Sequence, residues 1–292
     1  MKQITREAYA KINLGLDVTG KRDNGYHDVK MIMQSISLHD TLTFTEKAEG
    51  GVSISMEGGN ELVPLDDHNL IYKAIKKLCE YAEFSIPSVD IHLVKRIPVA
   101  AGLAGGSTDA AATIIAVNEM FELGLSAEQL CEVGVKVGAD VPFCIMGGTY
   151  LSEGIGEVLT PIASNAQLKL LLVKPNAAVS TPQVYADLDE IDNLPHPDID
   201  SLREGVEAGD IAKITRFMGN VLELATIPEH PEIDALKHIL MARGALAAMM
   251  SGSGPTVFAI FDNDEKRKEA KDALSKLSGI EGVFECECVS GN

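Results

Sequence analysis

Tryptophan is absent from this sequence, and aromatic residues make up only 5% of it. Basic residues are also scarce, with 25 lysines and arginines against 43 aspartates and glutamates, for a formal net charge of −18. A general nucleic-acid-binding protein needs a basic face that displaces counterions. The charge balance therefore argues against that class and, more weakly, against binding to anionic membranes. It does not indicate disorder, because apolar residues reach 46% of the 292 residues.

Long hydrophobic runs are missing as well. The apolar stretches at 170–173 and 245–250 are far shorter than the roughly 20 residues of a membrane-spanning helix. Charged residues interrupt the N-terminal segment, which excludes a signal-peptide core, so we expect a cytoplasmic protein. The cysteines are odd in number and scattered, which predicts reduced thiols rather than a disulfide framework or a zinc site; they are Cys79, Cys131, Cys144, Cys286 and Cys288.

Strand and helix patterns alternate along the chain. Apolar residues occupy every second position from Ala8 to Leu16, which predicts a half-buried strand over 8–18. The remaining patterns predict strands over 29–38, 41–45, 52–56, 89–94 and 168–173, helices over 69–81, 110–121, 126–137 and 233–242, a loop over 138–143, and a strand, glycine turn and strand over 245–261.

The organisation that follows is α/β (or α+β), with two domains at 1–160 and 161–292 and a boundary near Pro161. One segment of the second domain is unusual. Residues 187–210 contain nine acidic residues, one basic residue and four prolines or glycines. This composition predicts a solvated, partly irregular face.

The most informative string is PVAAGLAGGSTDAAA, Pro98–Ala112. Glycines let backbone amides approach a ligand, and a helix that starts directly afterwards directs its free N–H groups and positive dipole end at the same place. The string lacks the lysine of a Walker loop and the spacing of a Rossmann fingerprint, and a protein-kinase glycine loop is not followed by such a helix. A tight strand-to-helix turn is the plainer interpretation of any single glycine here. Three glycines, two hydroxyls and an immediate helix together favour a polyphosphate site.

This string resembles the second motif of the galactokinase, homoserine, mevalonate and phosphomevalonate kinase (GHMP kinase) family. Three other segments are similar to its N-terminal motif, its catalytic aspartate loop and its C-terminal glycine motif: AKINLGLDVTGKRDNGYH at Ala10–His27, GADVPF at Gly138–Phe143 and SGSGPTVFAIF at Ser251–Phe261. Together the motifs span almost the whole chain. Ala104 and Thr108 depart from the glycine and serine usual there, but alanine retains the backbone amide and threonine the hydroxyl.

The resemblance implies a two-domain kinase with an N-terminal ATP-binding domain and a C-terminal ferredoxin-like domain. The AK-x-N opening, the NGYH turn and GADVPF are most similar to one branch. That branch transfers the γ-phosphoryl group of ATP to the 2-hydroxyl of a cytidyl-erythritol substrate, in non-mevalonate isoprenoid precursor synthesis. The alternatives are another small-molecule kinase of the family and a non-catalytic nucleotide-binding regulator. The charge balance argues against a nucleic-acid or membrane partner, and the sequence leaves monomer and homodimer open.

Two residues carry the implied chemistry. Lys11 would be a fixed cation between the acceptor hydroxyl and the transferred phosphoryl group, and Asp140 the catalytic base or the group that orients the hydroxyl. A strand lysine is also typical of a solvated edge, and a loop aspartate is also typical of a turn or helix cap. The functional interpretation therefore requires the fold to bring the two side chains together.

The remaining implied site residues divide by ligand. For the acceptor, Asn13 would bind the erythritol or phosphate part, Tyr26 would stack on cytosine, His27 would read its polar edge, and Tyr185 would form a second wall beside Thr181. For ATP, the adenine pocket would include Asn69 and Lys95, and the phosphate loop would comprise Pro98, Val99, Ala100, Ala101, Gly102, Leu103, Ala104, Gly105, Gly106, Ser107 and Thr108.

Charge distribution adds two expectations. Both substrates are anionic, and residues 1–30 carry six basic and four acidic residues, which predicts a positive mouth in a negative protein. Mg²⁺ is expected because the phosphates of ATP need neutralising. The hydroxyl of Ser107 or Thr108 is a candidate ligand for it, and the other protein ligands stay open.

Overall fold

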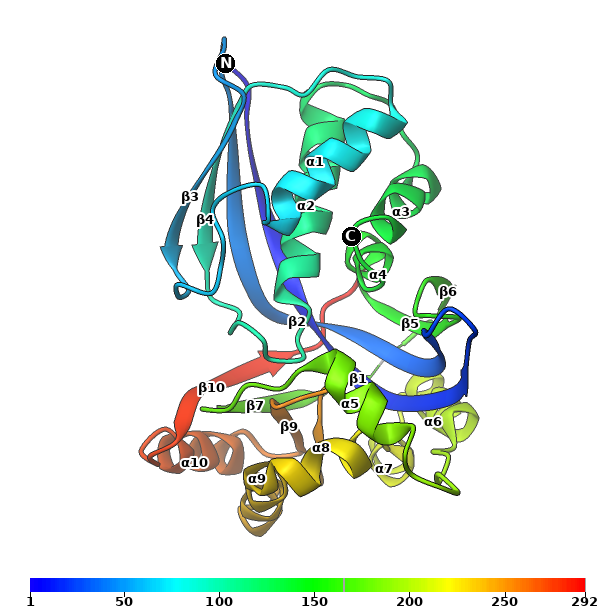
Figure 1. The fold of residues 1–292 in the computed structure, drawn as a ribbon. Coiled ribbons are helices and arrows are strands. Elements are labelled where there is room, and N and C mark those ends of the chain that lie inside the picture. Colours follow the sequence, from blue (N-terminus) through cyan, green and yellow to red (C-terminus); the bar gives the residue numbers. More distant parts are fainter. Residues whose placement is uncertain (165, 292) are drawn as a thin grey trace.

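Two β-sheets organise the computed structural model (Figure 1). One lies in the first half of the chain, which ends at Pro161, and the other lies in the second half, which follows it. It describes residues 1–164 and 166–291. The first sheet has the order β3–β4–β2–β5–β6, with β1 paired to β2. Its strands are β1 Gln3–Lys21, β2 His27–Glu46, β3 Val52–Gly58, β4 Val89–Lys95, β5 Thr149–Glu153 and β6 Val158–Pro161. The second sheet has the order β10–β7–β9–β8, from β7 Lys169–Pro175, β8 Ala247–Met250, β9 Val257–Phe261 and β10 Ile280–Glu287.

Ten helices cover these sheets within the described residues. In the first half, four helices pack beside the first sheet (Figure 1): α1 Leu70–Tyr81, α2 Gly105–Met120, α3 Ala127–Val135 and α4 Val141–Met146. In the second half, α9 and α10 pack on the second sheet and α6 contacts β1 and β2. The helices of this half are α5 Thr181–Leu188, α6 Ile199–Ala208, α7 Ile211–Phe217, α8 Glu223–Glu229, α9 Pro231–Ala242 and α10 Asp264–Leu274.

The hairpin of β1 and β2 links the two halves. Separate strands at 29–38 and 41–45 were the wrong prediction, because β2 runs unbroken from 27 to 46 against β1. Register shifts near Lys11 and Gly15 interrupt the pairing. The expectation of a half-buried strand was also wrong, since every residue from 10 to 18 is buried. One face of β1 packs against the first half of the molecule, and its opposite face packs against the second half.

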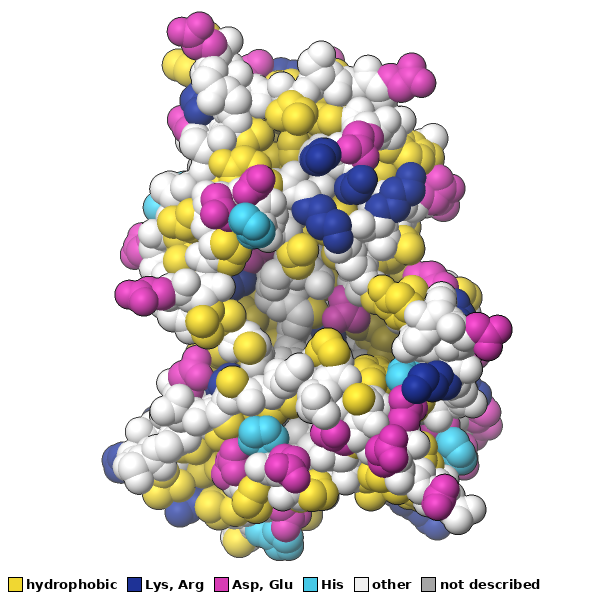
Figure 2. Space-filling view, in the orientation of Figure 1, with side chains coloured by type: hydrophobic (Ala, Val, Ile, Leu, Met, Phe, Trp, Pro, Cys, Tyr) yellow, Lys and Arg dark blue, Asp and Glu magenta, His cyan; other side chains and the backbone are white. Residues whose placement is uncertain are grey.

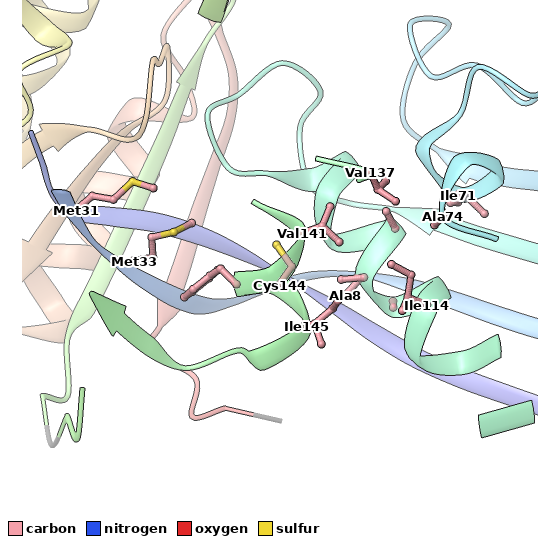
Figure 3. Close-up of a cluster of buried hydrophobic side chains, with 14 of the residues drawn as sticks. Ala8, Met31, Met33, Ile71, Ala74, Ile114, Val137, Val141, Cys144 and Ile145 are labelled. Atoms are coloured by element: carbon pink, nitrogen blue, oxygen red, sulfur yellow. The ribbon is translucent and has the colours of Figure 1, made fainter. Parts of the chain in front are cut away.

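The two faces belong to different cores. One core includes the space between the first sheet and its helices, where Ala8, Met33, Ile71, Ile114 and Val141 lie (Figure 3), and it continues into the second half between the second sheet and its helices. The other core lies between the two sheets. Ala10, Ile12 and Leu14 from β1 meet β7, β9 and α6 there. Burying apolar side chains on both faces of one strand therefore joins the halves into one structure.

Several local predictions can be compared with the structure. Ser126 caps α3 in a full capping box with Gln129, as its position indicates. The stretch 138–143 is only partly a loop, because α4 begins at Val141. The segment 187–210 is partly irregular and solvated, as its composition predicts: residues 191–198 lie outside helices and strands, and α6 buries Ile199 and Leu202 while it exposes its acidic residues. All five cysteines are free thiols.

The C-terminus returns to the first half. After β10, isolated bridges join Cys288 to Ile36 and Gly291 to Gly147, so the last described residues lie beside α4 (Figure 1). Among the described residues, no helix is both long and apolar enough to cross a lipid bilayer.

Candidate functional site

A cleft of about 980 Å³ lies where the two halves meet, and Figure 2 shows the surface hollowed between them. Its walls come from distant parts of the chain. The β1–β2 hairpin, the loop before α1, the 98–107 loop and the start of α4 line it from the first half, and α5 and the 252–253 turn line it from the second. The segments singled out in the sequence therefore meet at one place.

The glycine loop is held against the second half. Gly102 has a φ of +72°, and a Cβ there would lie 2.2 Å from the carbonyl oxygen of Ser251. The Ser251 hydroxyl also donates a hydrogen bond to the Gly102 carbonyl oxygen at 3.0 Å. Only glycine satisfies both the backbone conformation and the close approach. The Ser251–Gly254 turn thus packs directly on the glycine loop.

Helix α2 starts in an arrangement suited to an anion. Ala104 stands at its N-cap with a left-handed φ of +58°, and no side chain caps the helix. Gly105, Gly106 and Ser107 form its first turn and line the cleft. The first amides of a helix have no partner inside it, and its dipole favours negative charge there. A phosphate at this place would meet backbone donors without a competing side chain.

Two of the eleven predicted loop residues do not face the cleft. Leu103 is buried in the core between the sheets. The Thr108 hydroxyl donates to the carbonyl oxygen of Tyr9 at 2.7 Å, and its amide donates to Ala104. The expectation that Thr108 offers its hydroxyl to phosphate or metal is therefore wrong, because the side chain fastens α2 to β1. The other predicted loop residues, Pro98, Val99, Ala100, Ala101, Gly102, Ala104, Gly105, Gly106 and Ser107, all line the cleft.

Lys11 and Asp140 meet in this cleft. Lys11 Nζ lies 4.0 Å from Asp140 Oδ2, and it donates a hydrogen bond to Asn13 Oδ1 at 2.8 Å. The lysine side chain is only 6% exposed, so it is not a solvated strand edge. An ammonium group has three protons to donate. One amide oxygen and one distant carboxylate leave this buried cation able to bind a further anionic oxygen.

Asp140 occupies an N-cap position without acting as a cap. It precedes α4, yet its side chain accepts no capping hydrogen bond, and it is one-third exposed to the cleft. A purely structural aspartate at this position would accept from the helix amides. The turn at Gly252 closes the other side, since a Cβ there would lie 3.4 Å from Lys11 Nζ. The carboxylate is thus left free for a ligand.

A buried cluster of charged side chains packs against the glycine loop at the start of α2. Lys95 Nζ is paired with Asp40 Oδ2 at 2.5 Å and Asp109 Oδ2 at 2.6 Å. A Cβ on Gly105 would lie 3.1 Å from the same ammonium. Asn69, the other predicted adenine-pocket residue, caps α1 and binds the Pro64 carbonyl oxygen through its amide. Lys95 lines the cleft, but its charge is already engaged.

Sequence reasoning missed both aspartates of this cluster. Asp40 is fully buried and also accepts from the backbone amides of Arg96 and Ile97. Asp109 Oδ1 has no hydrogen-bond partner. Burial, partly opposed by the charge of Lys95, raises the pKa of Asp109 to about 7. For Asp109 the available signal was a carboxylate directly before the apolar run Ala110–Ala112, which a folded protein buries only with a partner; Asp40 stands between His39 and Thr41 and offered no such signal.

Near the β1–β2 hairpin and α5, the aromatic side chains of the cleft are arranged differently from the predicted two walls. Tyr26 is 58% exposed at the end of the hairpin. The Tyr185 ring stacks on the imidazole of His27, with centroids 4.8 Å apart and planes at 28°. Burial, together with the charge of Asp140, raises the pKa of Tyr185 to about 12. Thr181 shares a hydrogen bond of 2.6 Å with Ser253. In this structure, Tyr185 therefore supports His27 instead of presenting an open face opposite Tyr26.

Residues 1–30 were predicted to make the entrance of the cleft positive, but the basic side chains near the cleft come from other elements. Each of the six basic residues in 1–30 has an acidic partner within 4.0 Å, from Lys2 with Glu122 to Lys30 with Asp200. Figure 2 instead shows basic side chains gathered above the hollow, over α1 and α3. These elements carry Lys73, Lys76, Lys77 and Lys136. Local positive charge therefore comes from α1 and the end of α3.

One group of close potential metal ligands occurs among the described residues, at Asp66, Asp67 and His68. All three are exposed, and hydrogen bonds from His68 to Asp66 lower the pKa of that carboxyl and raise the pKa of the imidazole. These local bonds account for the group, so we assign no metal to it. Hard oxygen donors deeper in the cleft are the carboxylate of Asp140 and the hydroxyl of Ser107.

Comparison with known proteins supplies a second line of argument. Residues 69–148 match the model for the GHMP kinases N terminal domain, and residues 202–278 match the model for the GHMP kinases C terminal region. The chain is 49% identical over 270 residues to the 4-diphosphocytidyl-2-C-methyl-D-erythritol kinase of Lachnoclostridium phytofermentans, covering 92% of each chain. It is 44% identical to that of Lachnospira eligens, covering 98% of this chain and 99% of the relative.

Solved structures agree. A crystal structure of 4-(cytidine 5'-diphospho)-2C-methyl-D-erythritol kinase superposes with a TM-score of 0.82 at 30% identity, covering 99% of this chain and 100% of the other. Homoserine kinase from Cytophaga hutchinsonii superposes with a TM-score of 0.81 at 21% identity, covering 100% and 96%. The second likeness shows a shared fold alone. Both matches extend over the full length of the chain.

Proposed function

The chain belongs to the GHMP kinase family and, within it, to the 4-diphosphocytidyl-2-C-methyl-D-erythritol kinases, and from this membership we propose how its cleft works. It is an ATP-dependent phosphotransferase with an alcohol acceptor. The acceptor is 4-diphosphocytidyl-2-C-methyl-D-erythritol, and the γ-phosphoryl group of ATP is transferred to its 2-hydroxyl. The reaction belongs to the non-mevalonate route to isoprenoid precursors.

The observation that carries the proposed site is the approach of Lys11 to Asp140 beside the start of α2. A buried ammonium, a free carboxylate and a set of helix amides all line one cleft. Phosphoryl transfer proceeds through a loose transition state, so positioning and charge stabilisation provide most of the catalysis. These three groups can supply both, because the ammonium and the amides are fixed before the substrates bind.

We assign the roles by charge. The backbone amides of 105–107 hold the ATP phosphates, and the Lys11 ammonium lies between the γ-phosphoryl group and the acceptor. Asp140 accepts the hydrogen of the 2-hydroxyl. As the acceptor oxygen bonds to phosphorus, the bond from phosphorus to the β–γ bridging oxygen breaks and ADP leaves. The hydroxyl proton passes to Asp140 and then to solvent.

Mg²⁺ fits the donors on this side of the cleft. Magnesium prefers oxygen ligands and retains several waters while it binds substrate phosphates. The Ser107 hydroxyl is turned toward the loop that carries Asp140, since a Cβ on Gly138 would lie 3.9 Å from its oxygen. Ser107 would hold the ion with the phosphates, and the ion would neutralise charge that develops on the phosphoryl group.

The acceptor would lie along the hairpin and α5. Tyr26 and His27, which line the cleft, would contact the cytosine ring, with Tyr185 stacked on His27 and Thr181 at the edge. Asn13 would bind the erythritol part next to Lys11. We divide the chain at Pro161, where β6 ends the first sheet, into an ATP-binding domain at 1–160 and a GHMP-type domain at 161–292.

The test is an assay of ADP release with purified protein, Mg²⁺ and ATP. We expect ADP only when 4-diphosphocytidyl-2-C-methyl-D-erythritol is present, together with a product phosphorylated on the 2-hydroxyl. Homoserine and mevalonate serve as control acceptors. Turnover with one of these instead would assign another kinase activity, and an absence of turnover with every acceptor would indicate a nucleotide-binding regulator.

A further inference from the structure

Asp189 connects the two halves directly beside the acceptor side of the cleft. It follows α5 in the second half, and both of its carboxylate oxygens contact the β1–β2 hairpin of the first half. Oδ1 lies 2.7 Å from His27 Nε2, and Oδ2 accepts from Lys21 Nζ at 2.6 Å. Asp189, His27 and Lys21 all line the cleft.

The chemistry of this contact determines which nitrogen of His27 carries a proton. An ionised carboxylate only accepts hydrogen bonds, so the proton between the two groups belongs to His27 Nε2. Partial burial works against ionisation, but hydrogen bonds from Lys21 and His27 lower the pKa of Asp189. Lys21 also balances the negative charge of the carboxylate. In the neutral form of this imidazole Nδ1 carries the lone pair, and Nδ1 has no protein partner among the residues that the structure describes.

Stacking fixes the orientation of the same ring. The His27 side chain is only 9% exposed, and it lies on the Tyr185 ring at 4.8 Å. Turning the ring over about the Cβ–Cγ bond would put Cε1 in the place of Nε2 and break the bond to Asp189. Stack and carboxylate together therefore keep Nδ1 as the hydrogen-bond acceptor on this ring. A metal-bound histidine is oriented in the same way by a carboxylate on its other nitrogen.

We propose that Asp189 is a positioning residue that keeps His27 as an acceptor at Nδ1, so that the base site favours a pyrimidine bearing an amino group over one bearing a carbonyl at the same position. Cytosine offers an N4 amino donor, whereas uracil offers an O4 acceptor. The amino group pairs with Nδ1, and the carbonyl oxygen would face its lone pair. The proposal rests on the proposed function for the location of the base.

The first experiment measures base preference without phosphoryl transfer. The dissociation constants of CDP and UDP are determined by calorimetry for the wild-type protein, Asp189→Asn and Asp187→Asn. The amide of Asp189→Asn can accept from Nε2–H or donate to bare Nε2, so both tautomers become available. We expect the wild-type preference for CDP to fall by about tenfold or more, the usual scale when a buried donor or acceptor is left mismatched.

Asp187→Asn is the matched control. Asp187 lies in the last turn of α5, two residues before Asp189. Among the described residues its side chain bonds only to Gln183, and it does not line the cleft. Its variant should retain the CDP preference. If Asp189 only tethers the hairpin, Asp189→Asn weakens CDP and UDP binding by the same factor and the preference is unchanged. That result would overturn the proposal.

The second experiment observes the proton itself. Nitrogen NMR of protein labelled in histidine distinguishes a protonated from a bare ring nitrogen, and His27→Gln assigns the signals. We expect wild-type His27 to be protonated at Nε2 and bare at Nδ1, and Asp189→Asn to show a mixture. A wild-type proton on Nδ1 would overturn the proposal, even if the variant fails to fold. Because neither readout requires turnover, a protein that lacks kinase activity but shows both effects would disprove the proposed function alone.

Discussion

Lys11 and Asp140 face one another across 4.0 Å, one on a strand shared by both cores and the other at the start of a six-residue helix. Lys11 is buried within β1, and Asp140 directly precedes α4. Neither is saturated by its protein contacts, since Lys11 has one hydrogen bond and Asp140 has no capping bond. The pair therefore has the properties expected of groups that wait for a substrate.

Replacing Asp140 with asparagine should abolish turnover and spare nucleotide binding. The amide retains the shape but cannot take the hydroxyl proton. We expect kcat to fall by about 10²–10⁴-fold, the usual effect of removing a general base. The dissociation constant of an ATP analogue should change less than about threefold, as measured by calorimetry. Asp262→Asn, at an exposed position outside the cleft, is the control. Wild-type turnover in Asp140→Asn would remove Asp140 from the mechanism.

Lys11→Met tests whether the two groups act as a unit. Loss of one fixed cation should lower kcat by about 10²–10³-fold. If Lys11 and Asp140 act in the same step, the double variant with Asp140→Asn should be little slower than the worse single variant. Single-turnover kinetics of the four proteins supply the comparison. Effects that multiply fully would show that the groups contribute independently.

Gly102→Ala should destabilise the protein and weaken the contact between the glycine loop and the Ser251–Gly254 turn. The new Cβ would be placed 2.2 Å from the Ser251 carbonyl oxygen, in addition to the strain of φ +72°. Gly124→Ala is a matched control, because its φ is +70° and its Cβ would meet nothing within 4 Å. We expect a loss of about 1 kcal/mol for Gly124→Ala from backbone strain alone, and of about 3 kcal/mol or more for Gly102→Ala. Urea unfolding measures both, and equal losses would contradict the packing argument.

The buried Lys95 cluster predicts a pH dependence of stability. A carboxyl whose pKa is raised on folding binds its proton more tightly in the folded protein than in the unfolded chain. Its stabilising contribution is therefore complete below the unfolded pKa of about 4 and is lost as the pH rises through the folded pKa. For Asp109 the window is from about 4 to about 7.

Asp109→Asn replaces the titrating carboxyl group with a neutral amide, while Lys95 keeps its bond to Asp40. The unfolding free energy of the wild type minus that of the variant should decrease as the pH rises, by up to about 1.4 kcal/mol per pH unit, and level off above pH 7. Urea titrations at pH 5, 6, 7 and 8 provide the measurement. A difference that stays constant would show that Asp109 does not take up a proton in this range.

The basic side chains over α1 and α3 should accelerate capture of anionic substrates. Neutralising Lys76 and Lys136 together should lower kcat/KM for ATP several-fold at low ionic strength. The effect should vanish at high salt, where charges are screened within a few ångströms. Lys268→Gln on α10, at the far side of the second sheet, should change nothing. A defect that persists at high salt would indicate direct contact rather than steering.

Motifs with a strong local cause could be predicted from the sequence. The capping box at Ser126, the helix over 70–81 and the glycine loop before α2 depend on neighbouring residues and were found. The meeting of Lys11 with Asp140 depends on the whole fold, and only the resemblance to a known family suggested it. The usual glycine at position 104 is explained by the left-handed φ of +58°, which no spacing reveals.

What could not be predicted from the sequence is mostly which charged and polar groups pair with one another. Counting charges over residues 1–30 gave a positive mouth, but each of those bases has an acidic partner contributed by another part of the chain or the same hairpin. Asp40 and Asp109 look like ordinary acids until β2, β4 and α2 enclose them around Lys95. The Thr108 hydroxyl was assigned to a ligand, yet the nearest acceptor is the backbone of β1.

The strand β1 also limits how such a protein can be recombined. Ala10, Ile12 and Leu14 complete the core beneath the second sheet, although they belong to the first half of the chain. A chimaera that joins residues 161–292 of a relative to this first half would need a matching surface for those three side chains. Exchange of acceptor specificity by swapping whole halves is thus constrained at a place remote from either ligand.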